Sequence, residues 1–168
     1  MIDNELTKAS LTKFSQVDLL VLDVDGVLTD GSLYYTETGQ ELKKFNVKDG
    51  LGLKRVMQLG IVVAILSASA SRATLHRAKH LGISHVFIEV EDKLAQLKAL
   101  CDKLEIDLDR VAYLGDDLVD LPAMRAVGCP IAVADAMPEN RAAAIYVTQS
   151  RGGEGAVREV CDLIFLNA

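Results

Sequence analysis

The sequence has little of what marks secreted, membrane-spanning or disulfide-stapled proteins. Its 168 residues include only three cysteines, an odd number at distant positions, which is typical of a reduced cytosolic protein and not of a disulfide framework or a zinc site. The longest apolar run, residues 61–66, is too short to cross a bilayer, and the first residues lack the apolar core of a signal peptide. We therefore expect a cytoplasmic protein that does not bind a membrane.

Positive charge is also scarce, because 18 lysines and arginines face 24 acidic residues and leave a formal net charge of −6. No basic stripe offers to neutralise a phosphate backbone, so a nucleic acid is not an expected partner. A small anionic substrate remains compatible, since a few local cations can outweigh the global sign. Half of the residues are hydrophobic and no glycine- or serine-rich linker interrupts them, which predicts one folded domain over residues 1–168.

Short apolar runs alternate with helical patterns along the chain. We expect strands at residues 19–22, 61–66, 85–88, 111–114, 131–134 and 145–148. We expect helices at residues 3–14, 49–59, 72–81, 92–104, 118–126, after Pro138, and at 155–166. Strands separated by helices imply right-handed βαβ crossovers, so the predicted fold is a doubly wound, Rossmann-like α/β domain with a parallel sheet.

Residues 32–45 interrupt this alternation. Two short strands, 32–36 and 41–45, flank a glycine-containing turn and predict a β-hairpin inserted after the first strand. The hairpin has apolar side chains that nothing else in a single chain is expected to cover: Leu33, Tyr35, Leu42 and Phe45. Self-association would bury them, so we expect an oligomer.

Residues 21–30 contain the pattern that most strongly indicates a catalytic or metal site. An apolar strand ends in Asp23 and Asp25, and Gly26 follows at once. Residues two apart in a strand share a face, and two carboxylates this close repel each other unless a cation lies between them. Mg²⁺ suits such oxygen ligands, whereas a capped strand end with solvated aspartates is the ordinary alternative.

Further polar residues follow three other strands, and ligands of such sheets bind beyond the carboxyl ends of the strands. They are Ser67 and Ser69 after the second strand, Lys93 after the third, and Asp116, Asp117 and Asp120 after the fourth. Taken singly, each has an ordinary role as a turn residue, a helix cap or a solvated charge. Together they predict one site at the same edge of the sheet.

Phosphoryl transfer is the chemistry that this set suits. Asp23 would attack phosphorus, and Asp25 would protonate the leaving oxygen and later activate water. Ser67 and Lys93 would stabilise the charge on the phosphoryl oxygens. The side chains of Asp23 and Asp116, with the backbone carbonyl of Asp25, would hold Mg²⁺.

These segments resemble the motifs of the haloacid dehalogenase superfamily of phosphatases. The matching residues are Asp-Val-Asp-Gly-Val-Leu-Thr-Asp at 23–30, Ser67, Lys93 and Gly-Asp-Asp-x-x-Asp at 115–120. Residues 23–31, 45–50 (Phe-Asn-Val-Lys-Asp-Gly) and 151–159 resemble more narrowly a capless branch of this superfamily. Members of that branch work as tetramers and remove the phosphate from an eight-carbon 2-keto sugar acid in the synthesis of lipopolysaccharide precursors.

The resemblance implies roles for further residues. The sugar acid would contact Asp25 and Lys93 as well as Asn46, Lys48, Asp49, Gly50 and Arg77, while Asp117 and Asp120 would support the metal site. The hairpin would pack at the centre of a homotetramer. The Arg-Gly-Gly-Glu-Gly segment in the C-terminal tail, residues 150–168, would act as a mobile lid.

One position departs from the family pattern. The family has Gly-Arg soon after the residue that matches Ser67, and its arginine contacts substrate, whereas this chain has Ala68 and Ser69. The contact is therefore lost or taken over, with Arg72 or Arg77 as candidates. A nine-carbon, sialic-type acid 9-phosphate is an alternative substrate, and a receiver-like domain or an inactive phosphatase-like binding protein are alternative functions.

Overall fold

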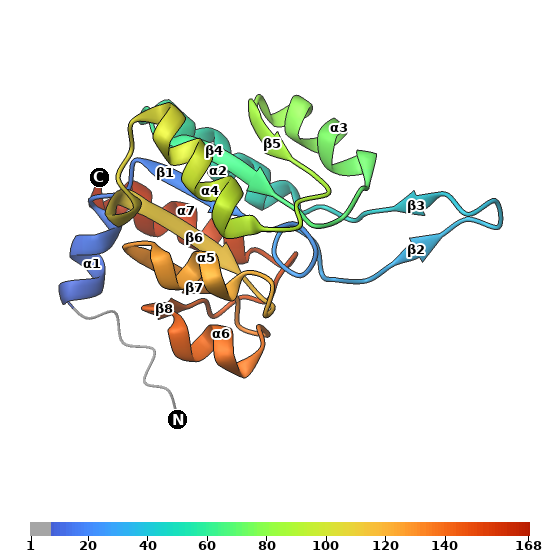
Figure 1. Cartoon of the computed structure of the whole chain (residues 1–168). Coiled ribbons are helices and arrows are strands. Elements are labelled where there is room, and N and C mark those ends of the chain that lie inside the picture. The colour runs from blue at the N-terminus through green and yellow to red at the C-terminus, as the bar shows by residue number, and fades with distance from the viewer. Residues whose placement is uncertain (1–7) are drawn as a thin grey trace.

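The structure, a computed structural model, describes residues 8–168, so the beginning of the helix expected at 3–14 lies outside the described residues. A six-stranded sheet runs through the molecule in the order β5–β4–β1–β6–β7–β8, and every neighbouring pair is parallel (Figure 1). The strands are β1 (Leu19–Leu22), β4 (Val62–Leu66), β5 (His85–Phe87), β6 (Val111–Gly115), β7 (Cys129–Ala132) and β8 (Tyr146–Val147). The predicted Rossmann-like α/β fold is confirmed.

Helices cover both faces of the sheet. One layer contains α1 (Lys8–Phe14), α2 (Val47–Gln58), α3 (Arg72–Leu81) and α7 (Ala156–Asn167), and the other contains α4 (Lys93–Leu104), α5 (Leu121–Ala126) and α6 (Pro138–Ala143) (Figure 1). A short 3₁₀ turn, η1 (Leu108–Arg110), precedes β6. Because both faces are covered, β1 is apolar throughout and its four residues are fully buried.

Three elements of the α/β alternation begin two or three residues away from the predicted position. Helix α2 begins at Val47 and not at residue 49, because the side chain of Asn46 caps it by accepting the N–H of Lys48 at 2.8 Å. Helix α5 begins at Leu121 and not at 118, because a turn closed by the Asp120 N–H and the Asp117 carbonyl (2.9 Å) precedes it. Strand β7 begins at Cys129, and the residues after Ala132 already turn towards α6.

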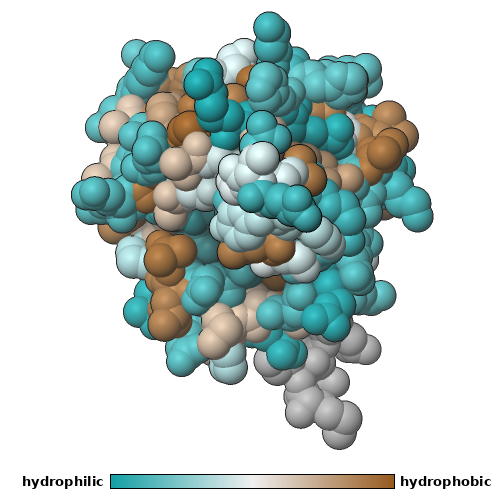
Figure 2. All heavy atoms as spheres, turned by 90° about the vertical axis from the view of Figure 1, so that its right-hand side faces the viewer, coloured by the Kyte–Doolittle hydropathy of each residue, from teal (hydrophilic) through white to brown (hydrophobic). Residues whose placement is uncertain are grey.

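The hairpin consists of β2 (Tyr34–Tyr35) and β3 (Glu41–Leu42), both shorter than predicted, and it projects away from the sheet (Figure 1). Three of its apolar side chains are uncovered in the single chain, with Leu33 61%, Tyr35 60% and Leu42 55% exposed. Phe45 was also expected to be uncovered, but it is partly buried because it packs against the core. Seen from the side towards which the hairpin points, hydrophobic side chains form separate patches among hydrophilic ones (Figure 2). Burial of the hairpin between subunits stays a prediction.

The last helix belongs to the core. Ala156, Val157, Val160 and Ile164 of α7 are fully buried, and α7 packs along α2. Only residues 150–155 of the expected C-terminal tail are therefore available to form a lid. Within residues 8–168, no helix combines the length and the apolar character that spanning a membrane requires.

We expect Ile164→Ala to lower the free energy of unfolding by about 2–5 kcal/mol, because it removes a fully buried side chain between α7 and the sheet. Leu166 lies on the same helix and is 77% exposed, so Leu166→Ala should change the same quantity by less than about 0.5 kcal/mol. Urea unfolding of both variants measures the difference. Equal effects would show that α7 is not part of the core.

Candidate active site

Asp23 lies where β1 ends and is held there by the sheet. Its N–H donates to the carbonyl of Leu114 at 3.1 Å, and the residue is only 5% exposed. The chain then turns sharply at Gly26, which has a φ of 91°. A Cβ at this glycine would lie 2.0 Å from Oδ2 of Asp116, so only glycine lets the turn approach that carboxylate.

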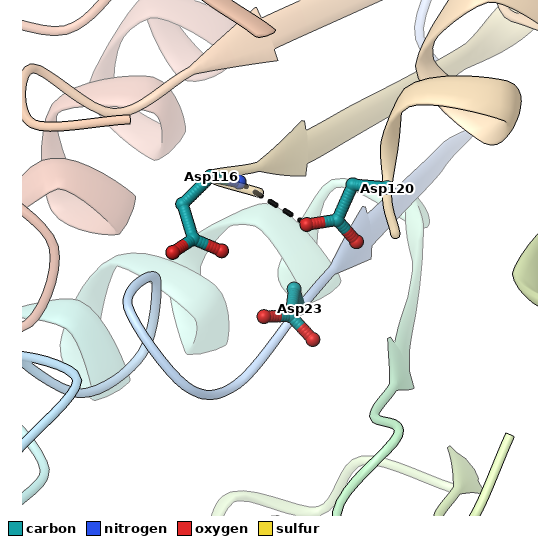
Figure 3. A group of neighbouring side chains, drawn as sticks. All are labelled: Asp23, Asp116 and Asp120. Carbon is teal, nitrogen blue, oxygen red and sulfur yellow. Dashed lines mark hydrogen bonds between the residues drawn. The ribbon is translucent and has the colours of Figure 1, made fainter. Parts of the chain in front are cut away.

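Three carboxylates meet at this edge of the sheet. Asp23 follows β1, Asp116 follows β6, and Asp120 comes just before α5; each offers an oxygen within 4.8 Å of the other two. Figure 3 shows the three side chains pointing towards one another. Asp120 is fully buried and Asp116 is half-buried. Buried carboxylates at this spacing repel strongly unless cations or protons compensate them.

Lys93 supplies one compensating charge. It is the first residue of α4, it is buried, and its Nζ donates to Oδ1 of Asp23 and to Oδ1 of Asp120, both at 2.6 Å. Asp120 also accepts the hydroxyl of Tyr113 at 2.8 Å and the backbone N–H of Asp116 at 3.2 Å. Asp120 therefore fixes the ammonium beside Asp23.

One ammonium does not balance three carboxylates, and the pKa values show it. Burial raises the pKa of Asp23 to about 6, with a further rise from Asp120 and an opposing effect of Lys93. Burial, followed by repulsion from Asp23 and Asp120, raises the pKa of Asp116 to about 8. Burial disfavours the charged Lys93, but its two carboxylate partners outweigh burial and raise the pKa of its ammonium.

The cluster fits a hard divalent cation. Oδ1 of Asp116 is buried and has no hydrogen-bond partner among residues 8–168, so a ligand oxygen is left over. The atoms of the three carboxylates that could bind a metal are all oxygens, which are the ligand atoms that Mg²⁺ prefers. A bound cation would also offset the repulsion that raises the pKa of Asp116.

Two other predicted catalytic residues lie at the neighbouring strand ends. Ser67 follows β4, whose Ile65 pairs with Leu22, and its buried Oγ accepts the N–H of Ser69 at 3.1 Å. Asp25 is half-exposed, and its Oδ1 is in contact with the ammonium of Lys43 from the hairpin. The four strand ends that were predicted to share a site are indeed neighbours, in the order β5–β4–β1–β6.

The residues predicted to contact the sugar acid, apart from Asp25 and Lys93, form a group around the beginning of α2. Asn46 donates to the carbonyl of Gly153 at 3.2 Å, and Arg77 donates to the carbonyl of Asn46 at 2.9 Å. A Cβ at Gly50 would lie 2.5 Å from a guanidinium nitrogen of Arg77, so this glycine makes room for the arginine. These contacts join α2 to α3 and to the segment before α7.

Lys48 and Asp49 lie on the same turn with opposite surroundings. Lys48 is exposed, whereas Asp49 is 1% exposed and accepts the N–H of Arg158 at 2.8 Å. Burial raises the pKa of Asp49 to about 6, and contacts with Arg158 and Arg77 oppose this rise. In the single chain Asp49 therefore caps α7, and a contact of this group with a sugar acid stays a prediction.

The glycine-rich segment before α7 lies against the turn after β1. Gly153 donates its N–H to the carbonyl of Val27 at 2.9 Å. A Cβ at Gly152 would come within 1.7 Å of the carbonyl oxygen of Gly26. The glycines thus permit the expected close backbone approach, while movement of residues 150–155 as a lid stays a prediction.

Sequence reasoning missed two contacts of the site and underrated a third residue. Tyr113 sits in an apolar strand, and the only hint was that a buried tyrosine hydroxyl needs a partner. Asp120 was expected to support the metal site, yet it also holds Lys93 in place. Nothing in the spacing of Lys43 pointed to Asp25, because the contact depends on how the hairpin folds back.

Comparison with known proteins agrees with this geometry. Residues 89–160 match the family model of haloacid dehalogenase-like hydrolases. The 3-deoxy-D-manno-octulosonate 8-phosphate phosphatase of Salmonella typhi is 47% identical over 93% of this chain and 83% of its own length. The corresponding enzyme of Escherichia coli K12 is 46% identical over the same shares.

Solved structures give the same result. The Moraxella catarrhalis 3-deoxy-D-manno-octulosonate 8-phosphate phosphatase, in complex with magnesium, phosphate and KDO, has a TM-score of 0.94 and 44% identity, covering 96% of this chain and 93% of its own. The cobalt-bound Haemophilus influenzae phosphatase has a TM-score of 0.89 and 40% identity, covering 92% and 91%. The buried group of Asp23, Lys93 and Asp120 lies beyond the carboxyl ends of the strands, where such a fold binds its ligands. Because the relatives are this similar over most of their length, the chain belongs to the 3-deoxy-D-manno-octulosonate 8-phosphate phosphatase family of haloacid dehalogenase-like hydrolases.

Proposed function

We propose that the protein is a Mg²⁺-dependent phosphatase that hydrolyses 3-deoxy-D-manno-octulosonate 8-phosphate to the sugar acid and inorganic phosphate. The observation that carries the proposal is the placement of Asp23, with Lys93 on one of its oxygens and Asp116 beside it, in a chain of this family. Relatives named for the eight-carbon acid favour this substrate over a nine-carbon one. A second acidic residue two positions after Asp23 favours hydrolysis over the stable phosphoprotein of a receiver domain.

The chemical steps follow from the residues at the edge of the sheet. Asp23, whose pKa of about 6 leaves it ionised at neutral pH, attacks phosphorus with a carboxylate oxygen, and the bond from phosphorus to the sugar oxygen breaks. Asp25 gives the leaving oxygen a proton. It then takes a proton from the water that attacks phosphorus of the aspartyl-phosphate, which releases phosphate and restores Asp23.

Charge on the phosphoryl oxygens is met by groups that are already in position. The ammonium of Lys93 is held by Asp120 and needs no reorganisation, and the Ser67 hydroxyl retains a proton to donate. Asp23 and Asp116, with the backbone carbonyl of Asp25, would hold Mg²⁺. When bound, this cation supplies Lewis-acid polarisation and offsets repulsion between the carboxylate and the phosphate.

We further propose a cytoplasmic homotetramer. The support for self-association is the hairpin, whose exposed apolar side chains Leu33, Tyr35 and Leu42 have no cover within the described residues of one chain. Its position beside Asp25, through Lys43, means that packing of the hairpin against another subunit would act directly on the site.

Asp23→Asn should lower phosphate release by at least about 10³-fold, because the amide has nearly the same shape but is a poor nucleophile. Phosphate release from the sugar acid phosphate with Mg²⁺ measures the loss, and circular dichroism checks the fold. The matched control is Asp102→Asn on the exposed side of α4, which should keep wild-type turnover. Substantial turnover by pure Asp23→Asn would contradict a covalent intermediate at this residue.

The stability of the metal-free protein should depend on pH through Asp116. Its pKa is about 8 in the folded protein and 3.8 as the unperturbed reference, so between these values the folded state binds a proton that the unfolded chain has released. This contribution to stability is complete below about pH 4 and is lost as the pH rises to about 8.

Mg²⁺ should therefore raise the Tm more at pH 8 than at pH 5.5, because it binds the ionised carboxylates. Thermal unfolding with and without Mg²⁺ at both pH values measures the shift. In Asp116→Asn the Mg²⁺-dependent shift should disappear and the metal-free Tm should vary less with pH. A wild-type Tm that does not respond to Mg²⁺ would speak against this metal site.

A further inference from the structure

Lys43 is a buried cation that the mechanism above does not use. It follows β3 in the stem of the hairpin, and its side chain is 2% exposed although the hairpin itself projects from the molecule. Its Nζ contacts Oδ1 of Asp25 and lies 3.2 Å from Oε1 of Glu41. Burying an ammonium is costly and buried ion pairs add little net stability, so folding alone does not account for this position.

Glu41 ties this ammonium to a second loop of the site. The ammonium of Lys43, and next the side chain of Ser71, hold the pKa of Glu41 below its usual range. Ser71 directly precedes α3, just after the Ser67–Ser69 turn, whereas Asp25 belongs to the turn after β1. The stem of the hairpin therefore reaches from one catalytic turn to the next, with Lys43 between them.

The contact between Lys43 and Asp25 obstructs the proposed acid–base role of Asp25. While the ammonium lies on Oδ1, that oxygen cannot pass a proton to the leaving oxygen of the sugar. Lys93 cannot displace Lys43 from Asp25, because its two described hydrogen bonds go to Asp23 and Asp120. An anion that arrives with the substrate can, together with Glu41, draw Lys43 away from Asp25.

We propose that Lys43 binds the carboxylate of the sugar acid and leaves Asp25 when this substrate enters. The inference rests on the proposed function and adds a specificity-determining residue to it. Glu41 keeps the ammonium at the site during the exchange, so that a small movement suffices. A phosphate ester with a carboxylate thus gains a charge-assisted contact and frees Asp25, whereas a neutral sugar phosphate leaves Lys43 where it is.

The test compares 3-deoxy-D-manno-octulosonate 8-phosphate with mannose 6-phosphate, a phosphate ester of a sugar that has no carboxylate. In both esters the leaving group is an alkoxide. Lys43→Met should lower kcat/KM for the sugar acid phosphate roughly 10- to 100-fold, mainly through KM, which is the loss of one charge-assisted hydrogen bond. For mannose 6-phosphate kcat/KM should not fall, because Lys43 makes no contact with this sugar and its removal frees Asp25, and Lys43→Arg should restore most of the discrimination. This comparison also separates the two anions of the substrate, since both esters carry the phosphate.

Lys44→Met is the matched control, because Lys44 is the next lysine on the hairpin, is exposed and pairs with Asp30. It should leave the ratio of the two kcat/KM values unchanged. Thermal unfolding shows whether Lys43→Met is folded, and Lys43→Gln, which keeps a polar side chain, replaces it if it is not.

Two results overturn the assignment of Lys43: an equal loss on both esters, which marks a structural role, and no loss on either. Both presuppose that the wild-type protein hydrolyses the sugar acid phosphate. A wild-type protein that hydrolyses mannose 6-phosphate but not the sugar acid phosphate overturns the proposed substrate, and the role of Lys43 with it. The two failures are therefore distinguishable in one experiment.

Discussion

The buried ammonium of Lys93, shared between Asp23 and Asp120, is the interaction on which the site depends. Burying a carboxylate is costly unless a positive charge compensates it. Lys93, the first residue of α4, places that charge at the end of β1. Asp120 and Tyr113 hold the ammonium from the other side. The ends of β1 and β6 therefore have to lie side by side, because only then can Lys93 contact Asp23 and Asp120 together and keep Asp23 ionised at neutral pH.

A single ammonium leaves the cluster short of positive charge, and that shortage gives the site its chemistry. Asp116 has a free buried oxygen and a raised pKa, so the cluster attracts a cation. A cluster that holds a cation also attracts the phosphate that is to be cleaved. The hairpin adds a second cation, Lys43, at Asp25, which connects the part of the chain that projects from the fold with the acid–base step.

Several elements were predictable because local patterns are strong. The apolar run of β1 followed by Asp23, the glycine that ends α3 with a φ of 81°, and Lys93 at the beginning of α4 all lie where the spacing placed them. The start of α2 was missed because a cap depends on one hydrogen bond of Asn46. The group around Asp49 was harder still, since the partner of Asp49 is Arg158, more than a hundred positions along the chain.

The sequence by itself determined the parallel α/β fold and the edge at which the polar residues gather, because hydrophobic periodicity and the direction of parallel strands are local properties. Only the tertiary structure decided which of those residues touch. Asp120 becomes the partner of Lys93, Asp49 becomes a cap of α7, and Lys43 reaches Asp25. The physical reason is that hydrogen bonds and ion pairs act over about 3 Å, and the chain packing that brings distant residues within that distance is not encoded in their spacing.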